Sequence, residues 1–373
     1  MVSRAIILGG LWALLACGPD QQATGDSGAQ EGSGGSQIYL ELDRNPTVSI
    51  GGEEVPLYRV TDALVSASGE IVVSDGAPRI LCFDSDGRER RSLGRAGDGP
   101  GEFRSIDWIH ELADDSLVAY DSRLRRATYF SSNGKIARVL RPDVSPEPRG
   151  APQIVGIFAD GSLLATQIIP PADHPQGPSF TIRPGLRLMR YGRDGSFQAD
   201  LGQFEGSELA YIQGVRLQTA EFLRNTIILV ANDQFYVASG DEFGASVFDQ
   251  DGVELRRISR PHTPIPIQES DLAQTHAPDG TPFPFPPEFP AVSSILVDAV
   301  GNLWVKPFTR QDPGKIDWSV FDVGGQFRGL VTLPGRFEPM EVGDDYVLGV
   351  ARDTLDVETV HLYGLSRGDR SSK

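Results

Sequence analysis

The chain has 373 residues, of which 39% are hydrophobic, and this is enough to bury a substantial core. Acidic residues outnumber basic ones by 51 to 34, giving a net charge of −17, which argues against a nucleic-acid partner because phosphate binding needs a basic face. The 42 glycines and 27 prolines favour many short strands joined by turns, and the two cysteines are too few for a disulfide framework. Composition therefore favours an all-β protein.

Residues 1–16 have the features of a signal peptide. Arg4 supplies a positive charge, and residues 5–13 form an apolar stretch too short to span a bilayer. The sequence Leu14-Leu15-Ala16-Cys17 that follows resembles a bacterial lipobox, in which cleavage leaves the cysteine at the new N-terminus as the lipid attachment site. We therefore expect Cys17 to anchor the protein in a membrane. The alternative is an ordinary secretory signal in which the cysteine is incidental.

The segment after the lipobox is expected to be a tether. Residues 17–36 contain Cys17 and then Gly18–Ser36, which has no aromatic or branched aliphatic side chain and cannot offset the entropy of ordering. A Gly/Ser-rich chain of this length has a root-mean-square reach of about 25 Å. By resemblance to lipoproteins, a glycine rather than an aspartate after the cysteine implies sorting to the outer membrane, and hence a location in the cell envelope.

From Ile38 onwards one pattern recurs: a short apolar strand, a Gly or Asp turn, a second strand, a loop, a strand that ends in an aromatic residue, and a hairpin. The clearest copy spans residues 64–93, four related units follow, and the last unit, beginning at Pro339, offers three strands only. Residues 37–42 supply the missing strand. We therefore predict that residues 37–373 form one six-bladed β-propeller that the N-terminal strand closes.

Loop lengths predict which end of the propeller carries function. In a four-stranded meander the first and third turns lie at one end, and the second turn and the connection to the next blade lie at the other. The short turns all fall at the first end. The long segments fall at the second end: 94–105, 142–153, 170–185, 202–213, 259–291 and 306–315. Because functional sites concentrate on variable loops carried by a rigid scaffold, we expect ligands or partners at this second end.

The first unit carries a family resemblance. Gly69–Asp75, Arg79-Ile80 and Phe83–Gly87, followed by Gly97-Asp98-Gly99-Pro100-Gly101-Glu102-Phe103, resemble NHL repeats, and more closely the six-bladed propeller lipoproteins of bacteria with the same G-D-G-P-G-E-F connector. The resemblance is strong over residues 64–103 and looser over 104–365. It implies the fold and an extracytoplasmic location, but it brings no common chemistry to named residues.

Polar residues recur at the ends of second strands. Asp75, Asp121 and Asp353 occupy this position, and basic residues follow the first two. Either each carboxylate accepts N–H bonds within its own turn, or the set forms a polar ring at the channel mouth. The candidate ligand-binding face on the second interpretation consists of Asp75, Arg79, Asp121, Arg123, Arg310 and Asp353.

The segment 259–291 is too long and too rich in proline for a simple connection. Phe283, Phe285 and Phe289 alternate with prolines in it. We expect this strip to pack onto its own propeller, with a plug of the central channel or a partner surface as the alternatives.

No catalytic motif stands out in the folded part, and no cofactor is predicted. Asp84–Gly87 and Asp249–Gly252 fit hairpin turns better than calcium loops, and His174, His262 and His276 lie in long loops where zinc could be held.

The leading hypothesis is a non-enzymatic binding or scaffold propeller, with a protein or glycan partner at the second end. The alternative is a lactonase-like hydrolase or lyase with a central divalent metal, calcium or zinc.

Overall fold

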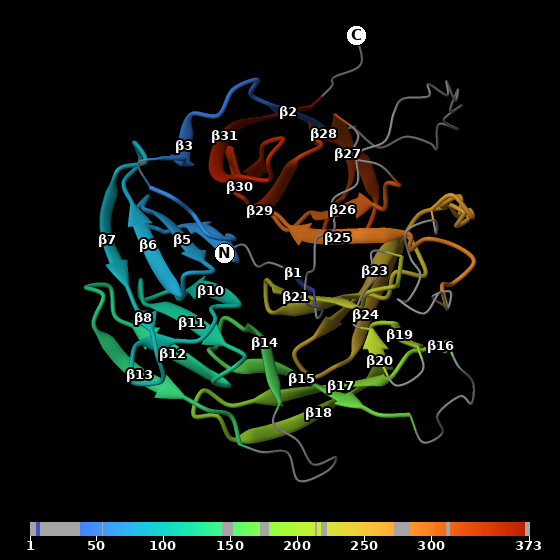
Figure 1. The fold of residues 1–373 in the computed structure, drawn as a ribbon, viewed down its shortest axis with the longest axis horizontal. Coiled ribbons are helices and arrows are strands. Elements are labelled where there is room, and N and C mark those ends of the chain that lie inside the picture. Colours follow the sequence, from blue (N-terminus) through green and yellow to red (C-terminus); the bar gives the residue numbers. More distant parts are fainter. Residues whose placement is uncertain are drawn as a thin grey trace.

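The computed structural model describes residues 5–7, 38–53, 55–143, 152–171, 179–212, 215–217, 222–271, 284–310 and 314–369. Every regular element among them is a β-strand. These residues therefore include no helix that is long and apolar enough to cross a bilayer. Six sheets are arranged around a common centre (Figure 1), and in each of them consecutive strands pair antiparallel. The predicted six-bladed β-propeller is confirmed.

The first three blades are antiparallel meanders that run outwards from the centre. The first contains β4 (Asp62–Val65), β5 (Ile71–Asp75), β6 (Arg79–Phe83) and β7 (Glu89–Leu93). The second contains β10 (Trp108–Glu111), β11 (Leu117–Asp121), β12 (Arg126–Phe130) and β13 (Ile136–Leu140). The third contains β14 (Gln153–Ile157), β15 (Leu163–Ile169), β17 (Gly185–Tyr191) and β18 (Phe197–Glu205).

The next two blades repeat the same order. The fourth contains β21 (Ile227–Ala231), β22 (Gln234–Ala238), β23 (Gly244–Asp249) and β24 (Glu254–Ser259). The fifth contains β25 (Val292–Val297), β26 (Leu303–Pro307), β27 (Lys315–Phe321) and β28 (Phe327–Pro334).

The sixth blade joins the two ends of the domain. Its inner strands are β29 (Phe337–Val342), β30 (Tyr346–Arg352) and β31 (Glu358–Asp369). The outer position is filled twice, because β2 (Ile38–Leu42) pairs with the far end of β31 and β3 (Val48–Gly51) pairs with its near end. Closure by the N-terminal strand was predicted and is confirmed. The second N-terminal strand, β3, was not predicted.

The core consists of layers between neighbouring blades. The buried hydrophobic residues form clusters that each combine two adjacent blades, and every junction of the ring has one. At the junction of the fifth and sixth blades, Trp304 and Trp318 pack with Phe337 and Tyr363. Both faces of a middle strand are therefore buried, as in β5 and β12, whereas β13 on the rim is largely exposed. This explains why the middle strands are continuous apolar runs.

Turn geometry follows the predicted division of the two ends. In the first five blades the turns between first and second strands, and between third and fourth, are short and use residues with positive φ. In the fourth blade Asn232 and Asp233 have φ values of 50° and 59°, which is the two-residue hairpin geometry that matches strand twist. We call the end with these turns the first face and the opposite end the second face.

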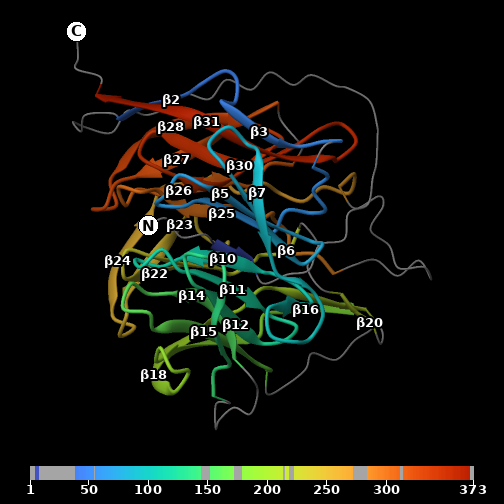
Figure 2. The same cartoon turned by 90° about the vertical axis from the view of Figure 1, so that its left-hand side faces the viewer.

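The second face carries extra strands. In the first connection, β8 (Arg95–Ala96) pairs in parallel with β9 (Glu102–Phe103). A separate sheet of β16 (Ser179–Ile182), β19 (Leu209–Ile212) and β20 (Val215–Leu217) lies beside the third and fourth blades, and Figure 2 shows β16 and β20 projecting to the right of the disc. Two segments predicted as loops, 170–185 and 202–213, therefore contribute strands to this sheet.

Close to the centre of the ring, β1 (Ala5–Ile7) runs antiparallel to β21, the innermost strand of the fourth blade (Figure 1). These residues belong to the apolar stretch of the predicted signal peptide. Cys17 and the rest of the predicted tether up to Ser36 lie outside the described residues.

The second N-terminal strand gives a test of ring closure. Ile50 of β3 is 2% exposed and packs in the layer between the sixth and first blades, so Ile50→Ala should lower the free energy of unfolding by about 3 kcal/mol. Ser49 of the same strand is exposed, and Ser49→Ala should change stability by less than about 0.5 kcal/mol. Urea unfolding measures both, and equal effects would show that β3 does not pack as described.

Candidate functional site

Buried carboxylates fasten the innermost strands to one another. Oδ2 of Asp62 in β4 accepts a hydrogen bond from the N–H of Ile109 in β10, at 3.0 Å. Oε2 of Glu341 in β29 accepts one from the N–H of Val65 in β4, at 2.6 Å. The innermost strand of a blade has an unpaired edge, and these side chains satisfy N–H groups that the ladder leaves open. The carboxylates therefore hold three successive blades in register around the centre.

Glu341 is held away from water. Burial raises the pKa of its carboxyl to about 7, although the N–H of Val65 and the hydroxyl of Tyr346, which donates to Oε1 at 2.9 Å, both favour the charged form. The negative charge of Asp62 adds to the rise. This carboxyl consequently titrates close to neutral pH.

Two of the predicted aspartates are fully buried in turns of the first two blades. Asp75 accepts the N–H of Ala77 at 3.1 Å and forms an ion pair with Arg79, also at 3.1 Å. Asp121 accepts the N–H groups of Arg104 at 2.7 Å and of Leu124 at 2.8 Å. Both carboxylates thus accept backbone N–H groups in their turns, as the first of the two interpretations of these aspartates requires.

The third aspartate, Asp353, also caps a turn, since its Oδ1 accepts the N–H groups of Leu355 at 2.7 Å and Val357 at 2.9 Å. Arg123 is exposed at the end of the second blade. Among the predicted residues only Arg310 lines the cavity described next. The structure therefore does not gather the predicted set into one site.

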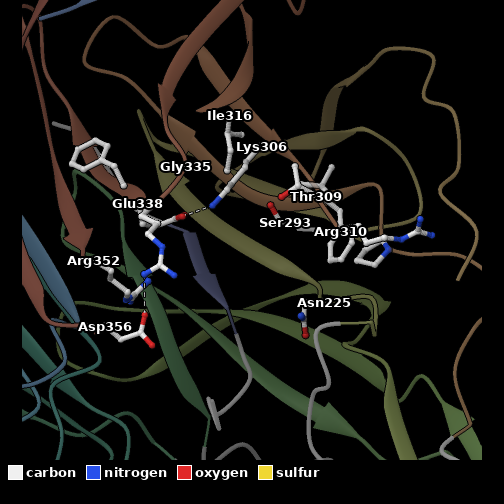
Figure 3. A pocket seen from close by; sticks show the side chains of 15 residues that line it. Asn225, Ser293, Lys306, Thr309, Arg310, Ile316, Gly335, Glu338, Arg352 and Asp356 are labelled. Atoms are coloured by element: carbon white, nitrogen blue, oxygen red, sulfur yellow. Dashed lines mark hydrogen bonds and ion pairs between the residues drawn. The ribbon is translucent and has the colours of Figure 1, made fainter. Parts of the chain in front are cut away.

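A cavity of about 550 Å³ opens on the second face, where the innermost strands of the fourth, fifth and sixth blades begin. This volume lies within the range of about 300–1,000 Å³ that is usual for small-molecule sites. The lining residues come from five chain segments: Asn225, Pro290, Val292, Ser293, Lys306, Phe308, Thr309, Arg310, Ile316, Gly335, Arg336, Phe337, Glu338, Arg352 and Asp356. In Figure 3, Arg352 and Asp356 lie on one side, Thr309 and Arg310 on the other, and the Lys306–Glu338 pair between them.

Charged side chains dominate the polar part of the lining. The ammonium of Lys306 pairs with Glu338 (Figure 3), joining the fifth blade to the sixth. Arg352 directs Nε and Nη2 to one oxygen of Glu358, at 3.1 and 2.8 Å, and the other oxygen of that carboxylate accepts the N–H of Val60. These pairs orient the cations without closing the cavity.

The apolar wall of the cavity is built on the proline-rich segment. Phe289 is 4% exposed and stacks on Phe308 with ring centroids 4.5 Å apart, and the guanidinium of Arg310 lies over its ring. Phe285 contacts the ring of Phe222 edge-on at 5.0 Å. For these two phenylalanines the expected packing onto the propeller is confirmed, whereas Phe283 lies outside the described residues.

The sequence placed residues 306–315 on the second face and singled out Arg310, but it did not identify Lys306, Arg336, Glu338 or Arg352 as site residues. Only Lys306 had a local sequence feature that could have marked it as a site residue, because it is a single cation directly after the apolar run Leu303–Val305. The others become neighbours through the packing of the sixth blade against the fifth, and no sequence spacing shows this.

The histidines described by the structure lie apart. His110 is in β10, and burial lowers its pKa to about 4. His262 stacks on Phe243 at 5.8 Å, and His361 in β31 hydrogen-bonds Thr359 and Tyr363. His174 and His276 lie outside the described residues, within which no group of three or more His, Cys, Asp or Glu side chains could hold a metal ion.

The fold defines the protein as a six-bladed β-propeller with a cavity on its second face. No protein-family model matches the sequence, and no curated protein matches it either. Among solved structures, a "putative exported protein" from Bacteroides fragilis is 12% identical with a TM-score of 0.50, and the match covers 88% of this chain and 96% of that one. A member of the DUF4221 family from Bacteroides vulgatus is 10% identical with a TM-score of 0.53, covering 90% and 99%.

A virginiamycin B lyase from Staphylococcus aureus is also similar, at 13% identity and a TM-score of 0.42, with 88% of this chain and 99% of that one covered. The similarity to the two Bacteroides structures shows a shared fold and nothing about chemistry.

The pKa of Glu341 predicts how stability depends on pH. Because its value of about 7 in the folded protein exceeds the ordinary value of 4.5, its contribution to stability is complete below about pH 4.5 and is lost as the pH rises through 7. Glu341→Gln keeps an acceptor but cannot ionise, so relative to wild type the variant should gain about 3 kcal/mol in the free energy of unfolding between pH 4.5 and pH 8. Urea unfolding at both pH values measures this.

The control is Glu89→Gln, at an exposed position on β7. Its stability relative to wild type should be the same at both pH values. If Glu341→Gln also showed a constant difference, the carboxyl would not titrate in this range.

Proposed function

We propose that the protein is a lipid-anchored binding propeller of the bacterial cell envelope, which takes a small ligand in the cavity on its second face. The observation that carries the proposal is the cavity itself. It lies on the second face of a closed ring, where the innermost strands of three blades begin, and strand ends and connections that the scaffold holds in place form its walls.

The location rests on the N-terminal sequence. The lipobox-like Leu14–Cys17 supports lipid attachment at Cys17, and the following glycine supports sorting to the outer membrane. The domain begins with β2 at Ile38, so the tether joins it at the outer strand of the sixth blade. Similarity of fold to a Bacteroides fragilis protein described as exported is in keeping with this location.

The repeats support a finer assignment. The first blade and its connector match the NHL-like pattern, and the connector is a compact unit in which Arg126 donates to the carbonyls of Asp98, Gly99 and Glu102. We assign the chain to the NHL-like propeller lipoproteins on this basis, with non-enzymatic binding as its activity.

Lipid attachment is tested by Cys17→Ala in the full chain produced in a double-membraned bacterium. The wild type should incorporate radiolabelled palmitate and fractionate with the outer membrane, because several acyl chains anchor a protein where one binds only marginally. The variant should lose the label and leave the membrane fraction. The second cysteine provides the control, since Cys82 is buried and Cys82→Ala should keep the label. Membrane retention of Cys17→Ala without label would contradict the anchor.

Ligand binding in the cavity is tested by filling it. Thr309 is half-buried at its wall, so Thr309→Trp should remove binding of fragments that a ligand-observed NMR screen identifies on the wild type. Thr332→Trp, at an exposed position on β28, is the matched control and should keep the same hits. A screen without hits, or hits that Thr309→Trp retains, would overturn the proposal that this cavity is the binding site.

A further inference from the structure

The chain enters the propeller on the first face. The turn between β30 and β31 lies on the second face, so β31 begins there at Glu358 and reaches the first face at its other end, Asp369. Ile38, the first residue of β2, is paired directly with Asp369. In Figure 2, β2 accordingly lies towards the left of the disc, whereas β16 and β20 of the second face lie towards the right. The segment that joins Cys17 to the domain therefore arrives on the side away from the cavity.

The turns between first and second strands are polar at their tips in most blades. In four blades such a turn is closed by a hydrogen bond from the N–H of its fourth residue to the carbonyl of its first. The third residue of this turn is polar in the first three blades: Ser68, Asp114 and Asp160. In the fifth blade it is Val300, whose side chain is 52% exposed.

The turns between third and fourth strands repeat this difference. Their second residue is polar in the first four blades: Ser85, Ser132, Arg193 and Gln250. In the fifth blade it is Val323, which is 60% exposed. A Cβ at Gly301 would lie 2.9 Å from Cγ1 of Val323, so the two turns of this blade touch. We call Val300 and Val323 the valine pair, an exposed apolar contact where neighbouring blades carry polar groups.

Buried polar contacts fasten the valine pair to the strand at which the chain enters. Asp298 is fully buried, and its carboxylate accepts the N–H of Val300 at 3.2 Å and a guanidinium N–H of Arg367 at 3.0 Å. Arg367 also donates to two backbone carbonyls in the turn between β29 and β30. It is paired with Leu40 of β2, two residues from Ile38. The valine pair is therefore held in a fixed position beside the point of entry.

The lipid anchor determines what this surface meets, so the inference rests on the proposed function, in which Cys17 is embedded in a membrane. A Gly/Ser-rich segment of the length of Gly18–Ser36 reaches about 25 Å, which keeps the first face close to the bilayer. Two valines alone would bind a bilayer weakly. Tethering makes the contact intramolecular, at an effective concentration of the order of millimolar, so a weak contact is sufficient.

We propose that the valine pair of the fifth blade rests on the lipid bilayer that holds the anchor, and that the second face with its cavity points away from the membrane. Apolar side chains leave water at the boundary of headgroups and acyl chains, whereas Asp114 and Asp160 at the equivalent turns stay hydrated. The disc is thus tilted with its fifth blade nearest the lipid, and the cavity opens to solvent.

Site-specific labels measure which face meets lipid. The full chain, lipidated at Cys17, is reconstituted into phosphatidylcholine vesicles that contain brominated phosphatidylcholine, which quenches a fluorophore on contact. A bimane label at Val323→Cys should lose fluorescence. A label at Leu355→Cys should keep it, because Leu355 is 82% exposed in the turn between β30 and β31 on the second face. The lipid blocks the thiol of Cys17, and Cys82 is buried, so neither takes the label.

A charge in the valine pair should release the face from the bilayer. Val300→Asp places there the side chain that Asp114 and Asp160 place at the same turn position, so the turn accommodates it. Most of the fluorescence of the label at Val323→Cys should return. Ser68→Asp, at this position of the first blade, is the matched control and should leave the quenching unchanged. Palmitate labelling and the melting temperature verify that both variants remain lipidated and folded.

The possible failures are distinct. If the labels at Val323→Cys and Leu355→Cys are quenched equally, or neither is quenched in a protein that carries palmitate, the inference is overturned and the anchor stands. Quenching at Val323→Cys that Val300→Asp leaves unchanged would show that the valine pair does not make the contact, which also overturns it. If the chain takes up no palmitate, the proposed anchor fails, and the inference fails with it.

Discussion

Burial between blades is the constraint on which the rest of the structure depends. A single four-stranded sheet has two faces, and here middle strands such as β5, β12 and β22 are buried on both, so no blade could stay in water on its own. Each face is covered only when a neighbouring blade packs on it. The described core is accordingly a cycle of inter-blade layers, such as that of Trp304 and Trp318 with Phe337. Closing the ring is thus a condition for covering the first and last faces.

The same arrangement places polar groups at the centre. Innermost strands have no further strand to pair with, and carboxylates such as Asp62 and Glu341 satisfy their edge N–H groups from the neighbouring blade. The cavity lies where three innermost strands begin, and there the space is lined by Lys306 and Glu338 rather than filled by apolar side chains. Ion pairs at this position join blades while leaving room between them. The scaffold and the site therefore use the same kind of contact, a charged side chain that reaches across a junction.

Sequence patterns predicted the fold because each blade repeats its own local signals. The hairpin turns, the two-sided apolar strands and the missing strand of the last unit were all visible, and residues 37–42 were placed correctly in the sixth blade. The strand at Val48–Gly51 was missed because it is short, lies between Pro46 and Gly52, and belongs to no copy of the repeat. Only the length of β31 makes room for it.

The cavity could not be predicted in the same way. Glu338 meets Lys306 from 32 residues away, and Arg310 meets the carbonyl of Pro266 from 44 residues away, so the contacts exist only once the blades are packed. The aspartates that did stand out, Asp75, Asp121 and Asp353, repeat because second turns repeat, and each accepts N–H bonds there. Repetition in a propeller thus marks a structural need that several blades share, whereas a ligand site breaks the symmetry and leaves no repeat.

The way the sixth blade is shared has a consequence for how the chain folds during synthesis. Residues 38–51 are among the first of the domain to emerge, but their partner strand, Glu358–Asp369, is among the last. Until that strand arrives, the first blade has one uncovered apolar face and the two N-terminal strands have no sheet to join. The contact that completes the ring spans most of the sequence, and contacts of such separation form slowly. An unfinished chain is therefore open at both ends, and it becomes a closed ring in a single late step.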